Sequence, residues 1–340
     1  MAGITAAGGM KKRIFDAAIA AKKAGLAKGQ LKHSFYDALL FNKIKRALGM
    51  NRIRFMVSGS APLSPNVMTF FRCVLGVPVV EGYGQTEGCA SATLSHVDDI
   101  DTVGHVGGPT AAVEVCLVDV PEMGYNANTD THHHGQPCQG RGEIWIRGAN
   151  VFVGYYKDEA KTRETIDEEG WLHTGDIGLW TLQGQLQIID RKKNIFKLSQ
   201  GEYVAPEKIE NILTQSLLIG QSFVYGDSFQ SCLVAVIVPD EEPVRTWAAG
   251  TPAERPSFAE MCASQELNDA IMADIKKLSK ENKLHGFETV KAVLLVPDPF
   301  TVENDLVTPT FKLKRQKLRD KYQTQIDAMY AALPPPKSKL

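Results

Sequence analysis

The sequence has little net charge, no long apolar run and no regularly spaced cysteines. Its 340 residues include 38 lysines and arginines against 39 acidic residues, so the net charge is −1. This balance excludes a polybasic nucleic-acid coat or an acidic solvating tail as the whole protein. No apolar run approaches the ~18 residues that a membrane-spanning helix needs. We therefore expect neither a nucleic-acid partner nor a transmembrane segment.

The six cysteines include no CxxC pair and no finger-like register with histidine. Structural zinc sites and disulfide frameworks use such spacings, so neither is predicted, and buried thiols in a reducing compartment are expected. The run His132-His133-His134 is interpreted as a solvated loop, with a metal site as the alternative. Adjacent residues on regular structure cannot all face one ion, which favours the loop.

The length predicts about two domains, at roughly 150 residues per domain, and the composition of 44% hydrophobic and 23% charged residues is ordinary for globular proteins. Changes in the sequence pattern divide the chain further. We predict an α/β segment over 1–100, a β-rich, barrel-like segment over 101–190, a small mobile α+β domain over 191–333 and an extended tail over 334–340.

The first hundred residues have the pattern of a layered α/β domain. Apolar residues at spacings of three and four indicate helices, and short apolar runs indicate strands. Ser64 and Pro65 predict the start of a further helix, with Ser64 as its N-cap, and Gly76 predicts its end. The other predicted elements are helices over 10–24 and 34–48 and strands over 52–57 and 77–80.

The remaining chain predicts more strands. Alternating segments separated by Gly, Pro and Asn indicate an antiparallel barrel or sandwich, with Gly184 in a hairpin turn. The charged run Asp190–Lys193 has no apolar residue to hold it and is typical of a linker or hinge. Beyond it, a helix is expected to begin at Pro206. The other elements predicted are strands over 113–118, 143–147, 178–182, 185–189, 222–225, 233–238 and 291–296 and helices over 241–249 and 266–283.

The glycine-rich run over 81–88 is the first candidate site. Its glycines let backbone amides approach a ligand closely. Tyr83 offers a flat face for stacking on a base, Thr86 a hydroxyl for a phosphate oxygen, and Glu87 a hard oxygen ligand for magnesium. Plain turn chemistry is the alternative.

Two further segments carry polar side chains of interest. Asp176, after His173-Thr174-Gly175, could accept hydrogen bonds from ribose hydroxyls, as in dinucleotide-binding folds. Its alternative role is to cap a turn. Residues 312–321 contain six bases and one acid, which by itself is typical of the solvated face of a terminal helix.

Taken together, these motifs resemble the adenylate-forming superfamily, and in form most closely the long-chain fatty acyl-CoA synthetases. The resemblance covers nearly the whole chain. It implies an α/β part and a β-barrel remnant of a large adenylate-forming domain, followed by a small α+β C-terminal domain. The residues that carry it are Ser58-Gly59-Ser60-Ala61-Pro62-Leu63, the run over 81–88, Gly170-Trp171-Leu172-His173-Thr174-Gly175-Asp176, Asp190-Arg191-Lys192-Lys193 and Thr308-Pro309-Thr310-Phe311-Lys312-Leu313-Lys314-Arg315.

The resemblance also implies roles for single residues. The catalytic residues would be Lys312, carried into the site by the small domain, Thr86 at the α-phosphate, and Glu87 as the Mg²⁺ ligand. Lys193 would lie at the interdomain hinge. The residues implied to bind ATP or CoA are Gly59, Ser60 and Ala61 at the adenine and acyl end, Gly82, Tyr83 and Gly84 at adenine, Asp176 and Arg191 at ribose, and Gly201 near the pantetheine path.

The implied activity is the AMP-forming activation of long-chain fatty acids, with ATP, Mg²⁺ and CoA. A fatty carboxylate would attack the α-phosphorus, and CoA would then attack the acyl-adenylate. The Ser/Thr/Gly-rich loop ending in Pro-Lys-Gly, which this family carries in its N-terminal half, is missing. We therefore expect the C-terminal half of such an enzyme. The alternatives are an inactive nucleotide- or acyl-CoA-binding or dimerisation module, and an adenylating enzyme of another branch.

The last three residues, Ser338-Lys339-Leu340, form the address that the peroxisomal import receptor reads. Three prolines over 334–336 hold the preceding segment extended. We predict a peroxisomal location, with the cytoplasm as the alternative. A peripheral membrane contact stays open.

Overall fold

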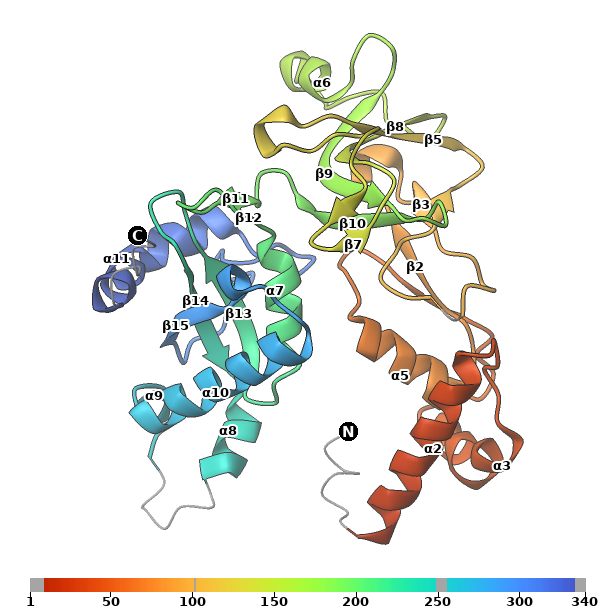
Figure 1. The fold of residues 1–340 in the computed structure, drawn as a ribbon, viewed down its shortest axis with the longest axis vertical. Coiled ribbons are helices and arrows are strands. Elements are labelled where there is room, and N and C mark those ends of the chain that lie inside the picture. Colours follow the sequence, from red (N-terminus) through yellow and green to blue (C-terminus); the bar gives the residue numbers. More distant parts are fainter. Residues whose placement is uncertain (1–8, 101, 249–255, 334–340) are drawn as a thin grey trace. The chain divides into compact units, whose positions relative to one another are not determined.

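The computed structural model describes residues 9–100, 102–248 and 256–333, and the chain divides into two compact units, Met1–Ile188 and Ile189–Leu340 (Figure 1). The units have separate hydrophobic cores. The peroxisomal address and the tail over 334–340 lie outside the described residues. Within those residues, no helix combines the length and the apolar character that crossing a membrane requires. The division into segments of 1–100, 101–190 and 191–333 stays a prediction.

Helices form the first part of the N-terminal unit. Helix α5 begins at Pro65 and ends where Gly76 adopts a left-handed φ of 61°, as predicted. Ser64 is the N-cap residue, as predicted, but its hydroxyl does not cap the helix: it is buried without a hydrogen-bond partner in the described part of the chain. The helices are α2 (Met10–Leu26), α3 (Ser34–Tyr36), α4 (Asn42–Ala47) and α5 (Pro65–Leu75), with a π-helical turn η1 (Asp37–Phe41) between α3 and α4.

The first sheet places α5 between two parallel strands. Strand β1 pairs with β2 so that Ser58 lies opposite Glu81. The strand predicted over 52–57 starts later and ends one residue later than expected, because the residues that pair with β2 are Met56, Val57 and Ser58. The sheet has the order β1 (Met56–Ser58), β2 (Val79–Tyr83), β3 (Thr93–Leu94) and β4 (Gly108–Pro109). This is the expected α/β layering.

The second sheet of this unit is antiparallel and open in the residues described, with the strand order β10-β9-β8-β5. The predicted turn forms at Gly184, whose φ is 74°. The histidine run lies in a small exposed hairpin. The elements are β5 (Val113–Val118), η3 (Pro121–Met123), the hairpin β6 (His132–His133) and β7 (Gln136–Pro137), β8 (Arg141–Gly148), α6 (Glu159–Thr165), β9 (Leu172–Trp180) and β10 (Leu186–Arg191). The predicted α/β class with a β-rich remnant is confirmed.

The C-terminal unit is built on a three-stranded sheet in the order β13-β14-β15, with α10 and α11 beside it (Figure 1). Every residue of β14 is buried. Leu233, Ala235 and Ile237 face the core that includes α7 and α10, whereas Val234 and Val236 face the core that includes α11. The elements are β11 (Phe196–Lys197), β12 (Tyr203–Val204), α7 (Pro206–Leu213), β13 (Ile219–Tyr225), β14 (Leu233–Pro239), α8 (Glu241–Ala248), α9 (Phe258–Cys262), α10 (Gln265–Glu281), η4 (Gly286–Glu288), β15 (Val290–Leu295) and α11 (Arg315–Ala332).

The charged run that follows β10 is held by buried contacts. Asp190 is only 2% exposed, and its Oδ2 accepts a hydrogen bond from the backbone N–H of Glu207, in the first turn of α7, at 3.0 Å. Its Oδ1 accepts from the backbone N–H of Arg191 at 2.6 Å and from Asn194 Nδ2 at 3.4 Å. The prediction of a linker without buried contacts is therefore wrong at Asp190. This carboxylate satisfies an N–H of α7 that the helix's own N-cap, Ala205, cannot bind.

A buried ion pair joins α11 to α7. Arg315, the first residue of α11, donates from its two terminal nitrogens to Glu210 Oε1 at 3.1 Å and Oε2 at 2.5 Å. The backbone N–H of Val224 on β13 also donates to Glu210 Oε1, at 2.8 Å. Burial raises the pKa of Glu210 to about 7, although Arg315 lowers it. Burial and the Glu207 carboxylate likewise raise the pKa of Asp190 to about 7.

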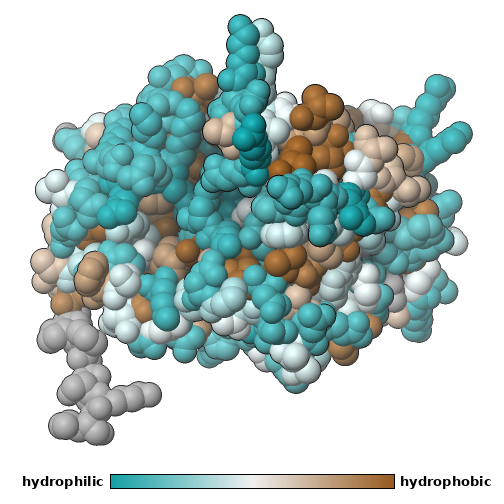
Figure 2. Space-filling view, turned by 90° about the horizontal axis from the view of Figure 1, so that it is seen from above, coloured by the Kyte–Doolittle hydropathy of each residue, from teal (hydrophilic) through white to brown (hydrophobic). Residues whose placement is uncertain are grey.

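The surface is mixed in polarity. On the face seen in Figure 2, apolar side chains lie in small patches between polar ones. All six cysteines are free. The expectation of buried thiols is wrong for Cys89, which is exposed, whereas Cys73, Cys138 and Cys262 are buried. Burial raises the pKa of each of these three thiols.

We predict that Arg315→Met destabilises the C-terminal unit by about 3–5 kcal/mol, because it leaves the Glu210 carboxylate buried without its cation. Amide hydrogen exchange of β14 measures the free energy of unfolding of this unit. The matched control in the same unit is Arg245→Ala on α8, which breaks an exposed pair with Glu241 whose side chains are 47% and 55% exposed. This control should change stability by less than about 1 kcal/mol. Equal effects of the two substitutions would contradict the assigned role of the buried pair.

Candidate functional site

The glycine-rich run forms a tight turn at the end of β2. A Cβ atom on Gly84 would lie 1.5 Å from the carbonyl oxygen of Ala90, so a side chain cannot be accommodated there. Cys89 and Ala90 have positive φ values of 45° and 85°, which bring the chain back toward β2. The single helical turn η2 (Thr86–Gly88) lies between Gly84 and these two residues, and Thr86 is exposed. The amides of Gly88, Cys89 and Ala90 bond to carbonyls within the turn, and Thr86 lies at its surface.

A buried carboxylate holds a second loop beside this turn. Glu81 on β2 is 5% exposed, and its Oε1 accepts a hydrogen bond from the backbone N–H of Leu63 at 2.9 Å. Burial raises the pKa of Glu81, and the amide of Leu63 lowers it. A Cβ on Gly59 would lie 3.2 Å from the carbonyl oxygen of Gly82. The loop that carries Gly59, Ser60 and Ala61 therefore runs along β2, and Ser60 has a strained φ of 72°.

Tyr83 joins the two sheets of the N-terminal unit. Its hydroxyl donates a hydrogen bond to Asp176 Oδ2 at 2.7 Å. Asp176 is 8% exposed and lies within β9, so the alternative of a turn cap is wrong. The backbone N–H of Asp176 donates to the Thr174 hydroxyl at 3.1 Å, which in turn donates to the carbonyl of Ile144 on β8 at 2.6 Å. An aromatic face and a carboxylate thus lie side by side.

Glu87 is bound by a segment that the sequence analysis did not single out. Its Oε1 accepts a hydrogen bond from the Tyr155 hydroxyl at 2.7 Å, and its carbonyl accepts from the backbone N–H of Phe152 at 2.7 Å. Asn150 Nδ2 donates to the carbonyl of Gly88 at 2.8 Å. Burial and the Glu87 carboxylate raise the pKa of Tyr155. This segment, over 150–155, orients the carboxylate of Glu87.

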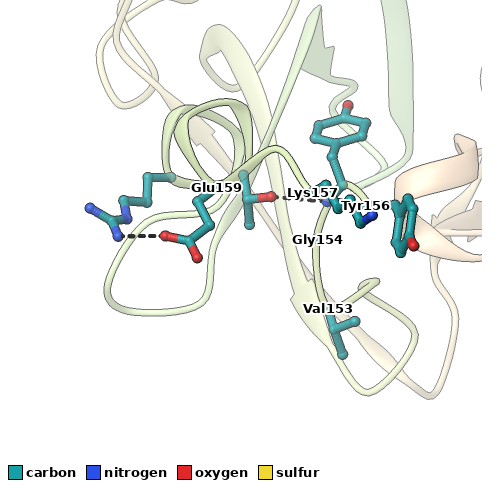
Figure 3. Close-up of a pocket in the computed structure, with 8 residues that line it drawn as sticks. Val153, Gly154, Tyr156, Lys157 and Glu159 are labelled. Atoms are coloured by element: carbon teal, nitrogen blue, oxygen red, sulfur yellow. Dashed lines mark hydrogen bonds and ion pairs between the residues drawn. The ribbon is translucent and has the colours of Figure 1, made fainter.

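A hollow of about 520 Å³ lies along the same segment (Figure 3). The backbone N–H of Tyr155 donates to the Thr162 hydroxyl at 2.9 Å, which holds the segment against α6. The residues that line the hollow include Lys157 and Arg163, and Arg163 pairs with Glu159 at 3.1 Å. The lining therefore carries two cations and one carboxylate, and one of the cations is paired.

The other predicted site residues lie in or next to the C-terminal unit. Arg191 ends β10, and Lys193 lies in the turn closed by the hydrogen bond from Asn194 N–H to the Arg191 carbonyl at 2.9 Å. Gly201 has a φ of 95° in the turn between β11 and β12. The structure thus gathers Gly59, Gly82, Tyr83, Glu87 and Asp176 in one unit, and the roles of Arg191, Lys193 and Gly201 stay predictions.

Lys312 lies in a compact loop before α11. Its carbonyl accepts from the Thr308 N–H at 2.8 Å, and its own N–H donates to the Thr308 hydroxyl at 3.1 Å. Phe311 has a φ of 60° and is exposed. Lys314 forms an ion pair with Asp305. The next residue, Arg315, forms the buried ion pair with Glu210, which holds the end of the loop. Hydrogen bonds and ion pairs therefore fix the backbone of the loop that carries Lys312.

Metal-binding clusters are absent from the described ranges: no group of three or more His, Cys, Asp or Glu side chains could hold an ion there. Glu87 is a single carboxylate. Mg²⁺ in nucleotide-dependent enzymes is usually held by one or two carboxylates together with substrate phosphates, so Glu87 fits that kind of site.

Two of the residues that shape the site carried different signals in the sequence. Glu81 stands in an otherwise apolar strand, and an acid there could have been recognised as a buried hydrogen-bond acceptor. Tyr155 carried no such signal, because its partner Glu87 lies 68 residues away in the chain.

Two family descriptions together match most of the chain. Residues 12–156 match the family described as AMP-binding enzyme, and residues 193–334 match the AMP-binding enzyme C-terminal domain.

Curated relatives match over nearly all of this chain. It is 50% identical over 331 residues to "Long chain acyl-CoA synthetase 6, peroxisomal" of Arabidopsis thaliana, which covers 97% of this chain and 46% of that protein. It is 46% identical over 325 residues to human "Long-chain-fatty-acid--CoA ligase 1", with 95% and 45% covered. The chain spans about half the length of the curated relatives it matches.

Solved structures agree with this comparison. The adenylation domain of the carboxylate reductase from Mycobacterium chelonae has a TM-score of 0.70 at 32% identity, with 93% of this chain and 45% of that chain covered. The A domain of carboxylic acid reductase from Segniliparus rugosus, in complex with AMP and a co-purified carboxylic acid, has a TM-score of 0.67 at 33% identity, with 82% and 39% covered. Matches to both parts of the family, on this fold, show that the chain belongs to the AMP-binding, adenylate-forming enzymes.

Proposed function

We propose that this chain supplies the adenylate-binding residues and the mobile lysine of a long-chain fatty acid–CoA ligase. In this reaction a fatty carboxylate attacks the α-phosphorus of ATP and pyrophosphate leaves. The thiol of CoA then attacks the acyl carbon, and AMP leaves. The observation that carries the proposal is the Tyr83 ring beside the Asp176 carboxylate, joined at 2.7 Å next to a glycine-rich turn. The names of the relatives support the fatty acid and CoA as substrates.

The N-terminal unit would bind the nucleotide. Tyr83 would stack on adenine, with Gly82 and Gly84 allowing the base to approach the backbone. Asp176 would accept hydrogen bonds from the ribose hydroxyls, and Thr86 would donate to the α-phosphate. The loop over 59–61, held by Glu81, would line the adenine and acyl end of the site.

Glu87 would hold Mg²⁺ together with the phosphates of ATP, and Tyr155 would orient its carboxylate. When bound, the ion neutralises negative charge on the phosphates.

The C-terminal unit would supply the moving parts. Lys312 would stabilise the negative charge that develops between the carboxylate and the phosphate. Lys193 would lie at the hinge, Arg191 beside the ribose, and Gly201 near the path of the CoA pantetheine arm. The turn that carries Lys193 and the loop that carries Lys312 are each held by buried contacts to α7. They can therefore move as parts of one rigid body.

An inactive nucleotide- or acyl-CoA-binding module is the second candidate, because the chain spans about half of its relatives. The two candidates agree on AMP binding and differ on turnover. The two experiments below test these points separately.

We predict that AMP binds the chain and that Tyr83→Leu weakens binding by roughly tenfold to a hundredfold, the scale of one aromatic–base stack. Calorimetric titration measures the affinity. Tyr83→Phe keeps the ring and should retain most of the affinity. Tyr156→Leu, at a residue 87% exposed, is the matched control and should have no effect. The nucleotide site is refuted if Tyr83→Leu and Tyr156→Leu bind AMP equally well, or if wild type binds none.

We predict that Lys312→Ala lowers adenylation about 10²-fold or more, the scale for one group that stabilises transition-state charge. The assay is ATP–pyrophosphate exchange with palmitate, on this chain joined to the N-terminal half of the Arabidopsis relative. Lys321→Ala, an exposed lysine on α11, is the control. If Lys312→Ala spared adenylation and slowed only thioester formation from supplied acyl-adenylate, the assigned role would be wrong. If the joined enzyme showed no exchange at all, the inactive module would be favoured.

The chain would act in the peroxisome, in peripheral contact with a membrane, after import through the receptor for its terminal tripeptide. Two relatives with 50% identity carry "peroxisomal" in their names, which supports this location, whereas the human ligases do not. We predict that a fluorescent fusion of the chain enters peroxisomes and that deletion of Ser338–Leu340 leaves it in the cytoplasm. Peroxisomal fluorescence that persists after the deletion would contradict the address.

A further inference from the structure

Phe311, the residue before Lys312, has an unusual backbone conformation for a large side chain. Its φ is 60°, in the left-handed region, where a bulky residue is strained. The loop enforces this angle. The N–H of Phe311 donates to the Thr308 carbonyl at 2.8 Å, and Lys312 is bonded to Thr308 through both its N–H and its carbonyl. The strain at Phe311 is therefore built into the loop.

The base of this loop is anchored in the core that includes α11. Leu306 and Val307 belong to that core and are 4% and 2% exposed. Val307 pairs with Leu313 in an antiparallel bridge, and the N–H of Lys314 donates to the Leu306 carbonyl at 2.9 Å. The two arms of the loop thus hold its tip in one shape.

The ring of Phe311 adds nothing to the packing of its own unit. It is 80% exposed and belongs to neither of the two hydrophobic cores of the C-terminal unit. Glycine at this position would be free of both the backbone strain and the exposed apolar ring. Strained residues of this kind occur at functional sites, where the surrounding structure holds them. The ring is therefore suited to a contact that forms during the reaction.

The role proposed for Lys312 determines what the ring would meet. Consecutive Cα atoms are about 3.8 Å apart, so a loop that brings Lys312 to the reacting groups brings Phe311 there too. The acyl-adenylate formed at that point is a mixed anhydride. Water can attack its acyl carbon, which releases the fatty acid and AMP. An apolar ring beside this group excludes water and strengthens the attraction between the lysine ammonium and negative charge.

We propose that Phe311 shields the acyl-adenylate from water while Lys312 is at the reacting groups, so that the intermediate survives until the CoA thiol attacks it. Phe311 is then a specificity-determining residue, because it selects the thiol over water as the second nucleophile. The clamped tip of the loop keeps the ring beside the lysine. This inference rests on the function proposed above for Lys312.

The experiment compares two rates in the joined enzyme described above, with palmitate and ATP but without CoA. ATP–pyrophosphate exchange measures formation of the acyl-adenylate, and AMP release measures its hydrolysis. In Phe311→Ala the ratio of AMP release to exchange should rise roughly tenfold or more, the scale for the loss of one buried Phe side chain. Phe311→Leu keeps an apolar side chain and should raise the ratio less.

Two further variants separate shielding from a loss of structure. Leu217→Ala removes another apolar side chain of the same unit, 70% exposed, and should leave the ratio unchanged. Phe311→Gly removes the strain together with the ring. The midpoint of thermal unfolding of the 340-residue chain should therefore not fall in this variant, whereas the ratio should rise as in Phe311→Ala.

The possible results distinguish this inference from the proposed function. An unchanged ratio in Phe311→Ala, a parallel fall of both rates, or an equal rise in Phe311→Leu or Leu217→Ala would overturn the shielding role and leave the role of Lys312 intact. If the joined enzyme showed no exchange, or if Lys312→Ala spared it, the proposed function would fail, and the shielding role with it.

Discussion

The hydrogen bond between the Tyr83 hydroxyl and Asp176 Oδ2 is the constraint on which the candidate site depends. It ties the end of β2 to β9, so the last residues of one sheet are fixed against the middle of another. The tight turn at Gly84 follows Tyr83 directly in the chain, and Glu87, which accepts a hydrogen bond from Tyr155, lies just beyond it. An aromatic face, a carboxylate and a backbone turn thereby acquire one geometry, which suits base, ribose and phosphate in that order.

The C-terminal unit would have to carry the lysine proposed to be mobile, Lys312, without losing its own packing. The buried pair of Arg315 and Glu210 holds the start of α11, and Asp190 holds the turn after β10 to the same helix α7. Burying the two carboxylates of Asp190 and Glu210 near one guanidinium is unfavourable, as the raised pKa values of both groups show. Such a network is retained where position matters more than stability, which fits a lysine carried on a moving part.

Local sequence signals predicted much of the fold but little of what holds the site. Gly76 and Gly184 were placed correctly, because a left-handed φ is a property of a single residue. The buried role of Asp190 and the Tyr155–Glu87 bond were missed, because both depend on partners distant in the chain. The motifs predicted which residues form the candidate site, whereas the distances between these residues depend on the fold and could not be predicted from the motifs.

The proposed enzyme combines a nucleotide site on one unit with a lysine on the other. The central claim is that the Tyr83 ring and Asp176 hold a nucleoside. The most direct measurement is the nuclear Overhauser effect between bound AMP and the aromatic side chains of the chain. The account predicts cross-peaks from the adenine protons to the Tyr83 ring, and their loss in Asp176→Ala. Cross-peaks to the ring of Tyr156 instead, with none to Tyr83, would contradict it.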